Sequence, residues 1–207
     1  GPNSYQIMKD RGCKSKMDIL GSPRVEDFIF KKSDKKIKAL RKKYGDKIAV
    51  IYNTNNKMKN KDAKFNFKKV GLFLKSIGYT VIIKPHVRSI CNQKKLKDFV
   101  IFKDKRLEDQ LIHASDLMLF TYPSSVMIFG AVAQKPIISL YGDHWCDSAR
   151  FFSSKYSDIF LDLKSINQII PYINQNNNYA YFIDENLKFS KKEKSVDRII
   201  KFIINDI

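Results

Sequence analysis

Short runs of hydrophobic, mostly β-branched residues alternate along the middle of the chain with longer segments in which hydrophobic positions recur at helical spacing. These runs predict strands at 47–52, 79–84, 98–102, 116–120 and 135–140, and the segments between them predict helices at 65–76, around 107–112 and at 124–133. Strands that alternate with helices build a parallel sheet, and strands without polar alternation are buried on both faces. We therefore predict an α/β fold with a doubly wound parallel sheet and, over 164–207, helices at the carboxyl end.

The amino-terminal end of the chain follows a different pattern. Residues 1–4 look like the remnant of a cleaved expression tag and are left out of the fold prediction. Residues 5–20 predict a short helix and a strand, Gly21 to Arg24 a turn, and 33–43 a lysine-rich helix.

Composition and charge limit the classes of function. With 207 residues, 43% of them hydrophobic, the chain is long enough to bury the core of one domain or slightly more. Its apolar runs have the length of strands, so we expect no transmembrane helix and no signal peptide. The formal net charge is +18, and residues 31–70 alone carry 15 basic and three acidic residues. Such a local excess attracts nucleic acid, anionic lipid or an anionic polymer, while a lysine-rich surface without a partner is as good an interpretation.

The cysteine pattern and the absence of common catalytic motifs exclude several classes of function. Cys13, Cys91 and Cys146 are odd in number and lack CxxC spacing, which predicts neither a disulfide framework nor a zinc site and favours a cytoplasmic location. The sequence has no glycine-rich dinucleotide motif, P-loop, GxSxG elbow or HExxH pair. Asp143, His144 and Cys146 come close together in one loop but lack a second pair of donors, so we expect no metal held by protein ligands.

Ligands of doubly wound sheets bind beyond the carboxyl ends of the strands, so the loops there carry the candidate site. Ser124 and Ser125 follow the predicted strand 116–120 and open a helix, where two hydroxyls and unpaired backbone N–H groups favour an anion. The alternative is that these serines only cap the helix. A phosphate site at this helix start is therefore one of two open interpretations.

The loops after two other predicted strands add cations and hydrogen-bonding groups to the same edge. Lys84, His86 and Arg88 follow one strand and could together clamp a phosphate or a carboxylate, with His86 as a hydrogen-bond donor or a proton carrier. Asn53 and Thr54 follow the first strand and could contact the ligand from a third side, although they are equally typical of a simple turn. We expect these groups to converge with the serines across one crevice.

Two stretches of sequence resemble the nucleotide-binding half of GT-B glycosyltransferases: Val81-Ile-Ile-Lys-Pro-His-Val-Arg88 and the segment from Ala114 to Ser139. The resemblance extends to enzymes that build bacterial surface polymers from CMP- or CDP-activated donors, namely teichoic-acid glycerophosphotransferases, capsule Kdo transferases and polysialyltransferases. In those enzymes a loop histidine and paired serines hold the phosphates of the donor nucleotide, which implies this role for His86 and the Ser124-Ser125 pair. Val87 departs from the pattern, since those families usually have proline directly after the histidine.

The resemblance also implies how the chain is organised and what it binds. Residues 5–30 would be the end of an N-terminal domain with its linker, and 31–207 a Rossmann-like nucleotide-binding domain, which is half of a GT-B fold. It implies a transferase with a CMP- or CDP-linked donor of a sugar or polyol, a polysaccharide or polymer acceptor, and no other cofactor. His86 is the candidate catalytic residue. Such enzymes commonly take their base from the other half, so the chain alone would bind nucleotide without transferring anything.

The basic segment 31–70 has a place in this scheme and in its alternative. Under the resemblance it would hold the enzyme at an anionic surface, peripheral to the inner face of the cell membrane, or at a polymer acceptor. The alternative is a nucleic-acid-binding module, in which aromatic residues should be interleaved with the lysines. The phases of Tyr44, Tyr52, Phe65 and Phe67 instead suggest core positions, which makes nucleic acid the less favoured partner. A nucleotide-sugar epimerase with the same half-fold is a further alternative.

Overall fold

The computed structural model describes residues 2–15, 17–53, 66–86, 96–122, 124–140, 156, 159–175, 177–187 and 193–204. The chain forms two compact units. The larger unit, 33–177, contains the sheet, and the smaller unit combines 1–32 with 178–207. The junction between the units thus lies close to the boundary expected at residue 30, but the residues from Asn178 onward cluster with the amino-terminal segment.

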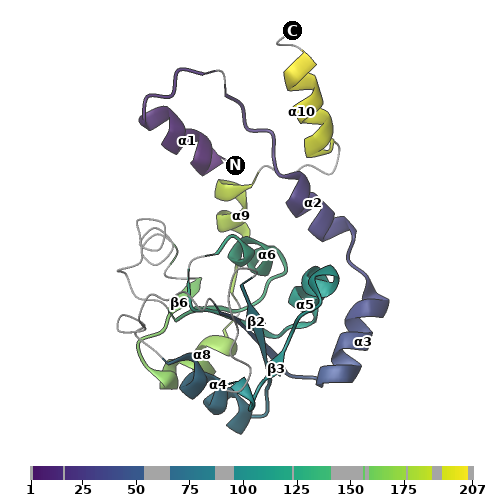
Figure 1. Cartoon of the computed structure of the whole chain (residues 1–207). Helices are drawn as coiled ribbons and strands as arrows, with labels where there is room; N and C mark the ends of the chain where they lie inside the picture. Colours follow the sequence, from purple (N-terminus) through teal and green to yellow (C-terminus); the bar gives the residue numbers. More distant parts are fainter. Residues whose placement is uncertain are drawn as a thin grey trace. The chain divides into compact units, whose positions relative to one another are not determined.

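A six-stranded sheet organises the larger unit, and every strand pairing among the described residues is parallel (Figure 1). The strands are β1 (Ile48–Asn53), β2 (Thr80–Pro85), β3 (Val100–Ile101), β4 (Leu117–Phe120), β5 (Ile137–Ser139) and β6 (Phe160–Asp162). Their order is β3-β2-β1-β4-β5-β6, which is the order of a Rossmann sheet and confirms the predicted fold class. The order reverses between β1 and β4, and sheets of this kind bind ligands at the carboxyl edge beside such a switch point.

Five of the six strands lie where the hydrophobic runs predict them. The prediction omits β6, because its three residues form too short a run to stand out from the sequence on both sides. β3 is shorter than predicted, since only Val100 and Ile101 pair with β2. A strand at the edge of a sheet has one neighbour, so less of it is fixed by pairing.

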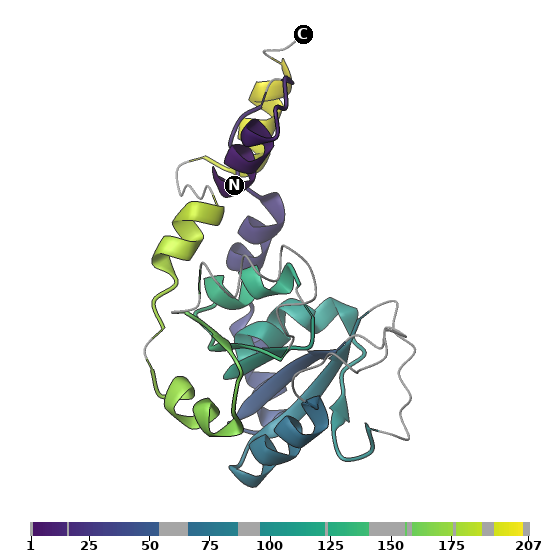
Figure 2. The same cartoon turned by 90° about the vertical axis from the view of Figure 1, so that its left-hand side faces the viewer.

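Helices cover both faces of the sheet, as a doubly wound fold requires. The helices of the larger unit are α3 (Asp34–Tyr44), α4 (Phe67–Ser76), α5 (Glu108–Ala114), α6 (Val126–Val132) and α8 (Ile169–Ile173), with 3₁₀ turns η2 (Lys105–Leu107) and η3 (Ile166–Gln168). On one face, α4 and α8 pack on a buried cluster that draws its strand residues from β1, β2, β4 and β5 (Figures 1 and 2). Gly71 allows this close approach of α4, because a Cβ atom there would lie 2.7 Å from the ring of Phe99.

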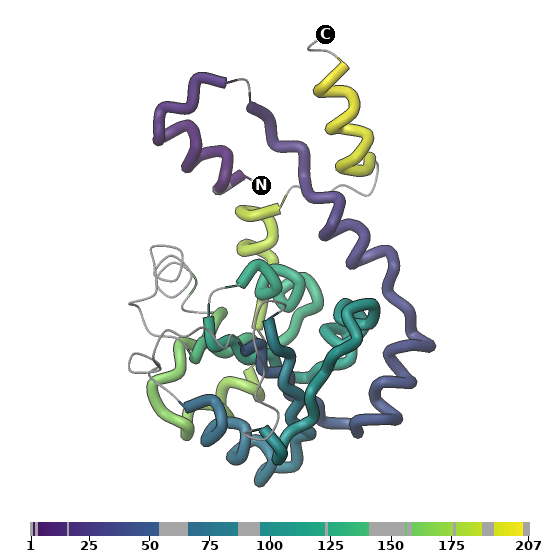
Figure 3. The backbone as a smooth tube through the Cα atoms, in the orientation of Figure 1, coloured from purple at the N-terminus to yellow at the C-terminus, as the bar shows by residue number. Residues whose placement is uncertain are grey.

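The opposite face of the sheet is covered by α5 and α6, and α3 lies against α5 (Figure 3). Gly130 brings α6 close to the strands, because a Cβ atom there would lie 2.8 Å from the sulfur of Met118. Asp116 fixes the end of α3 to the start of β1. Its carboxylate pairs with Arg41 at 2.6 Å and accepts a hydrogen bond from the N–H of Ile48 at 2.8 Å.

The smaller unit contains, among its described residues, the helices α1 (Pro2–Asp10), α2 (Pro23–Phe30), α9 (Ala180–Asn186) and α10 (Ser195–Ile204). Within it, α1 packs against α9 and α2 against α10. The strand predicted within 5–20 is wrong, because the described residues between α1 and α2 have no partner strand. The predicted turn at Gly21 to Arg24 is wrong in its second half. Ser22 caps α2 and Pro23 begins it, at the position where the missing N–H of proline removes no helical hydrogen bond.

A buried polar cluster ties α10 to α2 within the smaller unit. The Glu26 carboxylate accepts hydrogen bonds from the N–H of Ser195 at 2.9 Å, from the Ser195 hydroxyl, and from Arg198 at 3.4 Å. Arg198 also donates to the carbonyls of Leu20, at 2.8 Å, and Glu193. Glu26 and Arg198 are 5% and 9% exposed, so this ion pair is buried with its hydrogen bonds made.

Candidate functional site

Hydrogen bonds join the ends of β1, β2 and β4 at the switch point of the sheet. Asn53 is the last residue of β1 and is buried. Its carbonyl accepts a hydrogen bond from the N–H of His86 at 2.8 Å, and its side-chain oxygen accepts one from the hydroxyl of Thr121 at 3.2 Å. Asn53 therefore fixes the three strand ends relative to one another, and its contact with a ligand stays a prediction. Thr54 lies outside the described residues.

Tyr122, in the loop after β4, contacts both kinds of group that the sequence predicts to converge. The rings of His86 and Tyr122 meet edge to face, with centroids 5.7 Å apart and planes at 87°. The side chain of Ser124 lies close enough to the phenol of Tyr122 to influence its pKa. Burial raises the pKa of Tyr122, while Ser124 partly lowers it, and the phenol stays protonated at neutral pH. The structure thus brings His86 and Ser124 to the same aromatic ring.

The two predicted serines differ in their surroundings. α6 begins at Val126, later than the predicted start at Ser124. The half-buried Ser124 hydroxyl accepts a hydrogen bond from the N–H of Val126 at 3.2 Å, so it also takes part in closing the helix start. Ser125 is exposed and its side chain makes no capping hydrogen bond. Of the pair, Ser125 has the hydroxyl more accessible to a ligand.

The two cations predicted for the loop after β2 have different outcomes. Lys84 is 5% exposed, and its ammonium lies 3.2 Å from the carboxylate of Glu108, the first residue of α5. Glu108 thus neutralises the charge of Lys84, which the sequence predicts to face a phosphate. The contact of Lys84 with phosphate stays a prediction, and Arg88 lies outside the described residues.

Tyr52 forms part of the same buried layer as this ion pair. It pairs with Lys84 across β1 and β2 and stacks on Phe120, with ring centroids 5.0 Å apart. Its hydroxyl is buried without a hydrogen-bond partner among the described residues. Burial raises the pKa of Tyr52 well above its ordinary value, and the nearby charge of Glu108 raises it further. The buried side chains at the carboxyl edge of the sheet therefore form a region of low dielectric constant, in which electrostatic interactions are strong.

Two residues of this arrangement, Tyr122 and Glu108, are absent from the sequence prediction. Tyr122 stands directly before the Pro-Ser-Ser sequence, and an aromatic side chain in that loop was an available signal. Glu108 gave no such signal, because its pairing with Lys84 depends on how α5 packs against the sheet.

The described residues contain no group of three or more His, Cys, Asp or Glu side chains placed to hold a metal ion. None of their helices combines the length and the apolar character needed to cross a membrane. The loop with Asp143, His144 and Cys146 lies outside the described residues.

Comparison with known families decides what kind of domain this is. The sequence model of the CDP-glycerol:poly(glycerophosphate) glycerophosphotransferases matches residues 3–193. The chain belongs to this family. Family membership identifies it as a transferase domain and confirms the resemblance seen in the sequence. No curated protein sequence matches the chain.

Solved structures show the same fold for this glycerophosphotransferase-family chain. The UDP-GlcNAc 2-epimerase of Methanocaldococcus jannaschii, in complex with UDP-GlcNAc and UDP, is 18% identical, with a TM-score of 0.64 over 99% of this chain and 60% of the epimerase. The wall teichoic acid polymerase TagF is 16% identical, with a TM-score of 0.57 over 100% of this chain and 56% of the polymerase. At these identities the similarity concerns the fold alone. The chain spans 60% and 56% of the lengths of these two proteins.

Proposed function

We propose that this chain is the donor-binding domain of a glycerophospho- or glycosyltransferase that uses a CMP- or CDP-activated donor to build a bacterial surface polymer, either a teichoic-acid-like polymer or a capsule polysaccharide. The observation that carries the proposal is the shared contact of His86 and Ser124 with Tyr122 at the switch point of a Rossmann sheet. The family supports CDP-glycerol as the first donor to test. The acceptor would be a polymer chain, reached at the cytoplasmic face of the membrane.

The proposed chemistry is electrostatic. When a glycerophosphoryl group leaves CDP-glycerol for an acceptor hydroxyl, a bond forms from that hydroxyl to the distal phosphorus, the hydroxyl proton passes to a general base, and the bond to the bridging oxygen breaks. CMP departs with the negative charge of the broken bond. Hydrogen-bond donors fixed around the phosphates stabilise this charge most strongly as it develops. In this chain His86, Ser124 and Ser125 would supply such donors, and His86 is the candidate for a direct part in catalysis.

Tyr122 would act by positioning these groups. Its ring packs against His86, and the side chain of Ser124 lies beside its phenol. Both neighbours are therefore restricted in orientation before a ligand arrives, which lowers the entropy lost on binding. A positioning role predicts that the effect of Tyr122 on binding depends on the presence of Ser124.

The nucleic-acid alternative has less support from the described residues. Tyr52 is buried, and Phe67 packs against the buried cluster beneath α4. Aromatic rings in these positions do not stack on bases. Phe65 lies outside the described residues. The epimerase alternative rests on a similarity of fold. The nucleotide that the chain binds, UDP or CDP, would distinguish this alternative from the proposal.

Calorimetric titration of the chain with CDP, CMP and UDP tests the proposal. We expect CDP to bind, and to bind more tightly than CMP because its second phosphate adds hydrogen bonds and charge. Binding of UDP with none of CDP would favour the epimerase-like alternative. Absence of binding for all three nucleotides at millimolar concentration would contradict a donor-binding function.

Side-chain changes then locate the phosphates. Replacing both serines, Ser124→Ala with Ser125→Ala, should weaken CDP binding by roughly 1 to 3 kcal/mol if they bond to phosphate. Ser76→Ala is the matched control, because Ser76 is an exposed serine of α4 whose hydroxyl donates to the carbonyl of Phe73. Tyr122→Phe should weaken binding in the unaltered chain and have no further effect after Ser124→Ala. Additive losses would show that Tyr122 contacts the nucleotide directly.

A further inference from the structure

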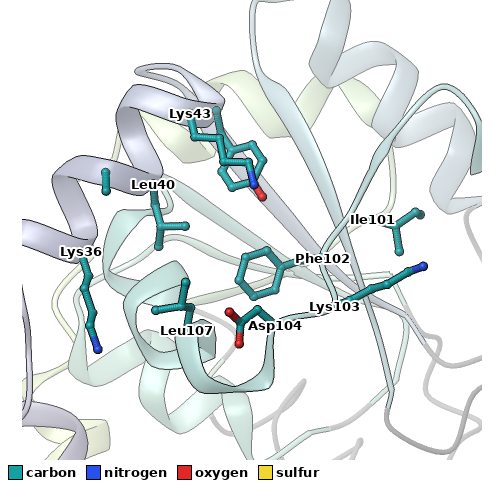
Figure 4. Close-up of a pocket in the computed structure, with 10 residues that line it drawn as sticks. Lys36, Leu40, Lys43, Ile101, Phe102, Lys103, Asp104 and Leu107 are labelled. Atoms are coloured by element: carbon teal, nitrogen blue, oxygen red, sulfur yellow. The ribbon is translucent and has the colours of Figure 1, made fainter.

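A pocket of about 360 Å³ lies between α3 and the segment that follows β3 (Figure 4). Its apolar walls come from Ala39, Leu40, Ile101, Phe102 and Leu107. The volume falls within the range of small-molecule sites. None of the lining residues belongs to the proposed donor site at the ends of β1, β2 and β4.

The walls of the pocket are anchored to the core of the larger unit. Leu40 and Phe102 are 5% and 4% exposed. The N–H of Phe102 donates to the carbonyl of Ile83 at 2.9 Å, which extends the pairing of β3 with β2 by one residue. α3 is held in place by its contact with α5 and by the ion pair of Arg41 with Asp116. The cavity is therefore part of the folded arrangement rather than a gap between loose side chains.

The mouth of the pocket is cationic. Lys36 and Lys43 of α3 and Lys103 after β3 line it, and Figure 4 shows Leu40 and Lys43 facing Phe102, with Lys36 and Lys103 toward opposite ends. The acidic lining residue, Asp104, accepts a hydrogen bond from the backbone N–H of the neighbouring Arg106 at 2.9 Å and lies 3.5 Å from its guanidinium. The charge of Asp104 is thus paired with that of Arg106 beside the pocket.

The helix that forms one wall adds to this positive field. α3 has six basic residues and one acidic residue in its 11 positions. A field of one sign over a low-dielectric wall concentrates ligands of the opposite sign. The apolar walls, in turn, take up hydrocarbon, at about 0.8 kcal/mol for each buried methylene group. The two properties side by side select a ligand that has both an anionic group and an apolar part.

We propose that this pocket binds an anionic amphiphile, with a hydrocarbon segment between α3 and Phe102 and a phosphate or carboxylate at one of the lining lysines, Lys36, Lys43 or Lys103. Such a ligand has two sources, a lipid of an anionic membrane surface or a free amphiphile in solution. A polyanion without an apolar part would not pack against the apolar walls formed by Leu40, Phe102 and Leu107.

Octyl phosphate, used as a monomer below its micelle concentration, is the first probe, because it joins one hydrocarbon chain to one phosphate. By calorimetry we expect one octyl phosphate per chain. It should bind at least about tenfold more tightly than inorganic phosphate, since two buried methylene groups already supply that factor. Equal affinity for octyl phosphate and inorganic phosphate, or no binding of octyl phosphate, would overturn the proposal.

Variants of α3 separate the pocket from the general charge of the helix. Ala39→Trp fills the cavity from an exposed position, and Lys36→Glu with Lys43→Glu reverses two lining charges. Lys38→Glu with Lys42→Glu is the matched control, because it reverses two exposed charges of the same helix outside the lining. We expect octyl phosphate affinity to fall about tenfold or more in the first two variants and about threefold or less in the control. Equal losses in the two double variants would overturn the proposal.

Vesicles distinguish the two sources of the ligand. Sedimentation with phosphatidylglycerol vesicles, with phosphatidylcholine vesicles as the control of zero net charge, measures binding to a lipid surface. Vesicle binding that is lost in Ala39→Trp assigns the pocket to a membrane lipid, whereas octyl phosphate binding without vesicle binding assigns it to a free amphiphile. Circular dichroism confirms that each variant is folded, and unchanged CDP titrations show that the donor site is unaffected.

Discussion

The two units of the chain differ in how many of their large hydrophobic side chains are exposed. Among the described residues, those of the larger unit are buried or half-buried except for Leu72 and Ile170. The smaller unit, with fewer than half as many residues, exposes Ile7, Met8, Phe30, Tyr181, Val196, Ile200, Ile203 and Ile204. Its α10 is instead attached through the polar cluster around Glu26. The comparison teaches that the sheet unit is stabilised by its apolar core, whereas the order of α10 depends on a few polar contacts.

Breaking the polar cluster should have the largest effect on this comparison. Glu26→Ala leaves the Arg198 guanidinium buried without its carboxylate partner, and we expect the free energy of undocking α10 to fall by about 3 to 5 kcal/mol. Hydrogen exchange should then increase in α10 and stay unchanged in the strands. Asp27→Ala is the matched control, because Asp27 is the next residue of α2 and its ion pair with Lys31 is exposed. It should change stability by less than about 1 kcal/mol. Equal exchange in both variants would contradict the role of the cluster.

Removing core volume should affect the larger unit in a comparable way. Leu74 is fully buried on α4, and Leu74→Ala should lower the free energy of unfolding of the sheet unit by about 2 to 5 kcal/mol, since it leaves a cavity. Ile203→Ala, at a side chain that is 54% exposed, should change stability by about 0.5 kcal/mol or less. Chemical denaturation followed by circular dichroism measures both. A large loss in Ile203→Ala would show that α10 is packed against something in solution.

The buried hydroxyl of Tyr52 should make the larger unit sensitive to alkaline pH. Folding raises the pKa of Tyr52 above its ordinary value of 10.0, so the unfolded chain loses this proton first as the pH rises. Ionisation of this phenol therefore leaves stability unchanged below pH 10 and lowers it as the pH rises above 10. Tyr52→Phe should remove this loss and, at neutral pH, stabilise the chain by about 1 to 2 kcal/mol, because no hydroxyl remains buried without a partner. Thermal unfolding at pH 7 and above pH 10 measures both effects, and a destabilised variant would show that the hydroxyl has a partner.

The exposed stripe of α10 should matter least for stability and most for association. Val196, Ile200, Ile203 and Ile204 recur at helical spacing, so they lie along one face of the helix. Ile200→Ser with Ile203→Ser should leave the unfolding of the sheet unit unchanged and reduce self-association at high concentration, as measured by sedimentation velocity. Unchanged association would show that this stripe does not mediate self-association.

The parts of the fold that follow from local pattern could be predicted. Strands buried on both faces give continuous apolar runs, which is why β1, β2 and β4 are evident in the sequence. The location of the candidate site followed from topology, because the carboxyl ends of parallel strands share one edge. The sequence therefore predicts His86 and Ser124 at the same edge, and their contact with a nucleotide stays a prediction.

Contacts between residues far apart in the chain could not be predicted. A lysine that follows a strand suggests a solvent-facing cation, and nothing near Lys84 indicates that Glu108 takes up its charge. Glu26 and Arg198 are likewise typical surface residues, and only the docking of α10 on α2 buries them together.

Gly130 makes the geometry of the serine loop depend on a contact inside the protein. α6 has seven residues and begins directly after Ser125. The distance between this helix and the sheet therefore determines how far the hydroxyls of Ser124 and Ser125 lie from the sheet. A methyl group at position 130 would meet the sulfur of Met118 and push the helix outward, carrying the loop away from His86. A buried residue outside the candidate site can therefore change the spacing between His86 and the two serines.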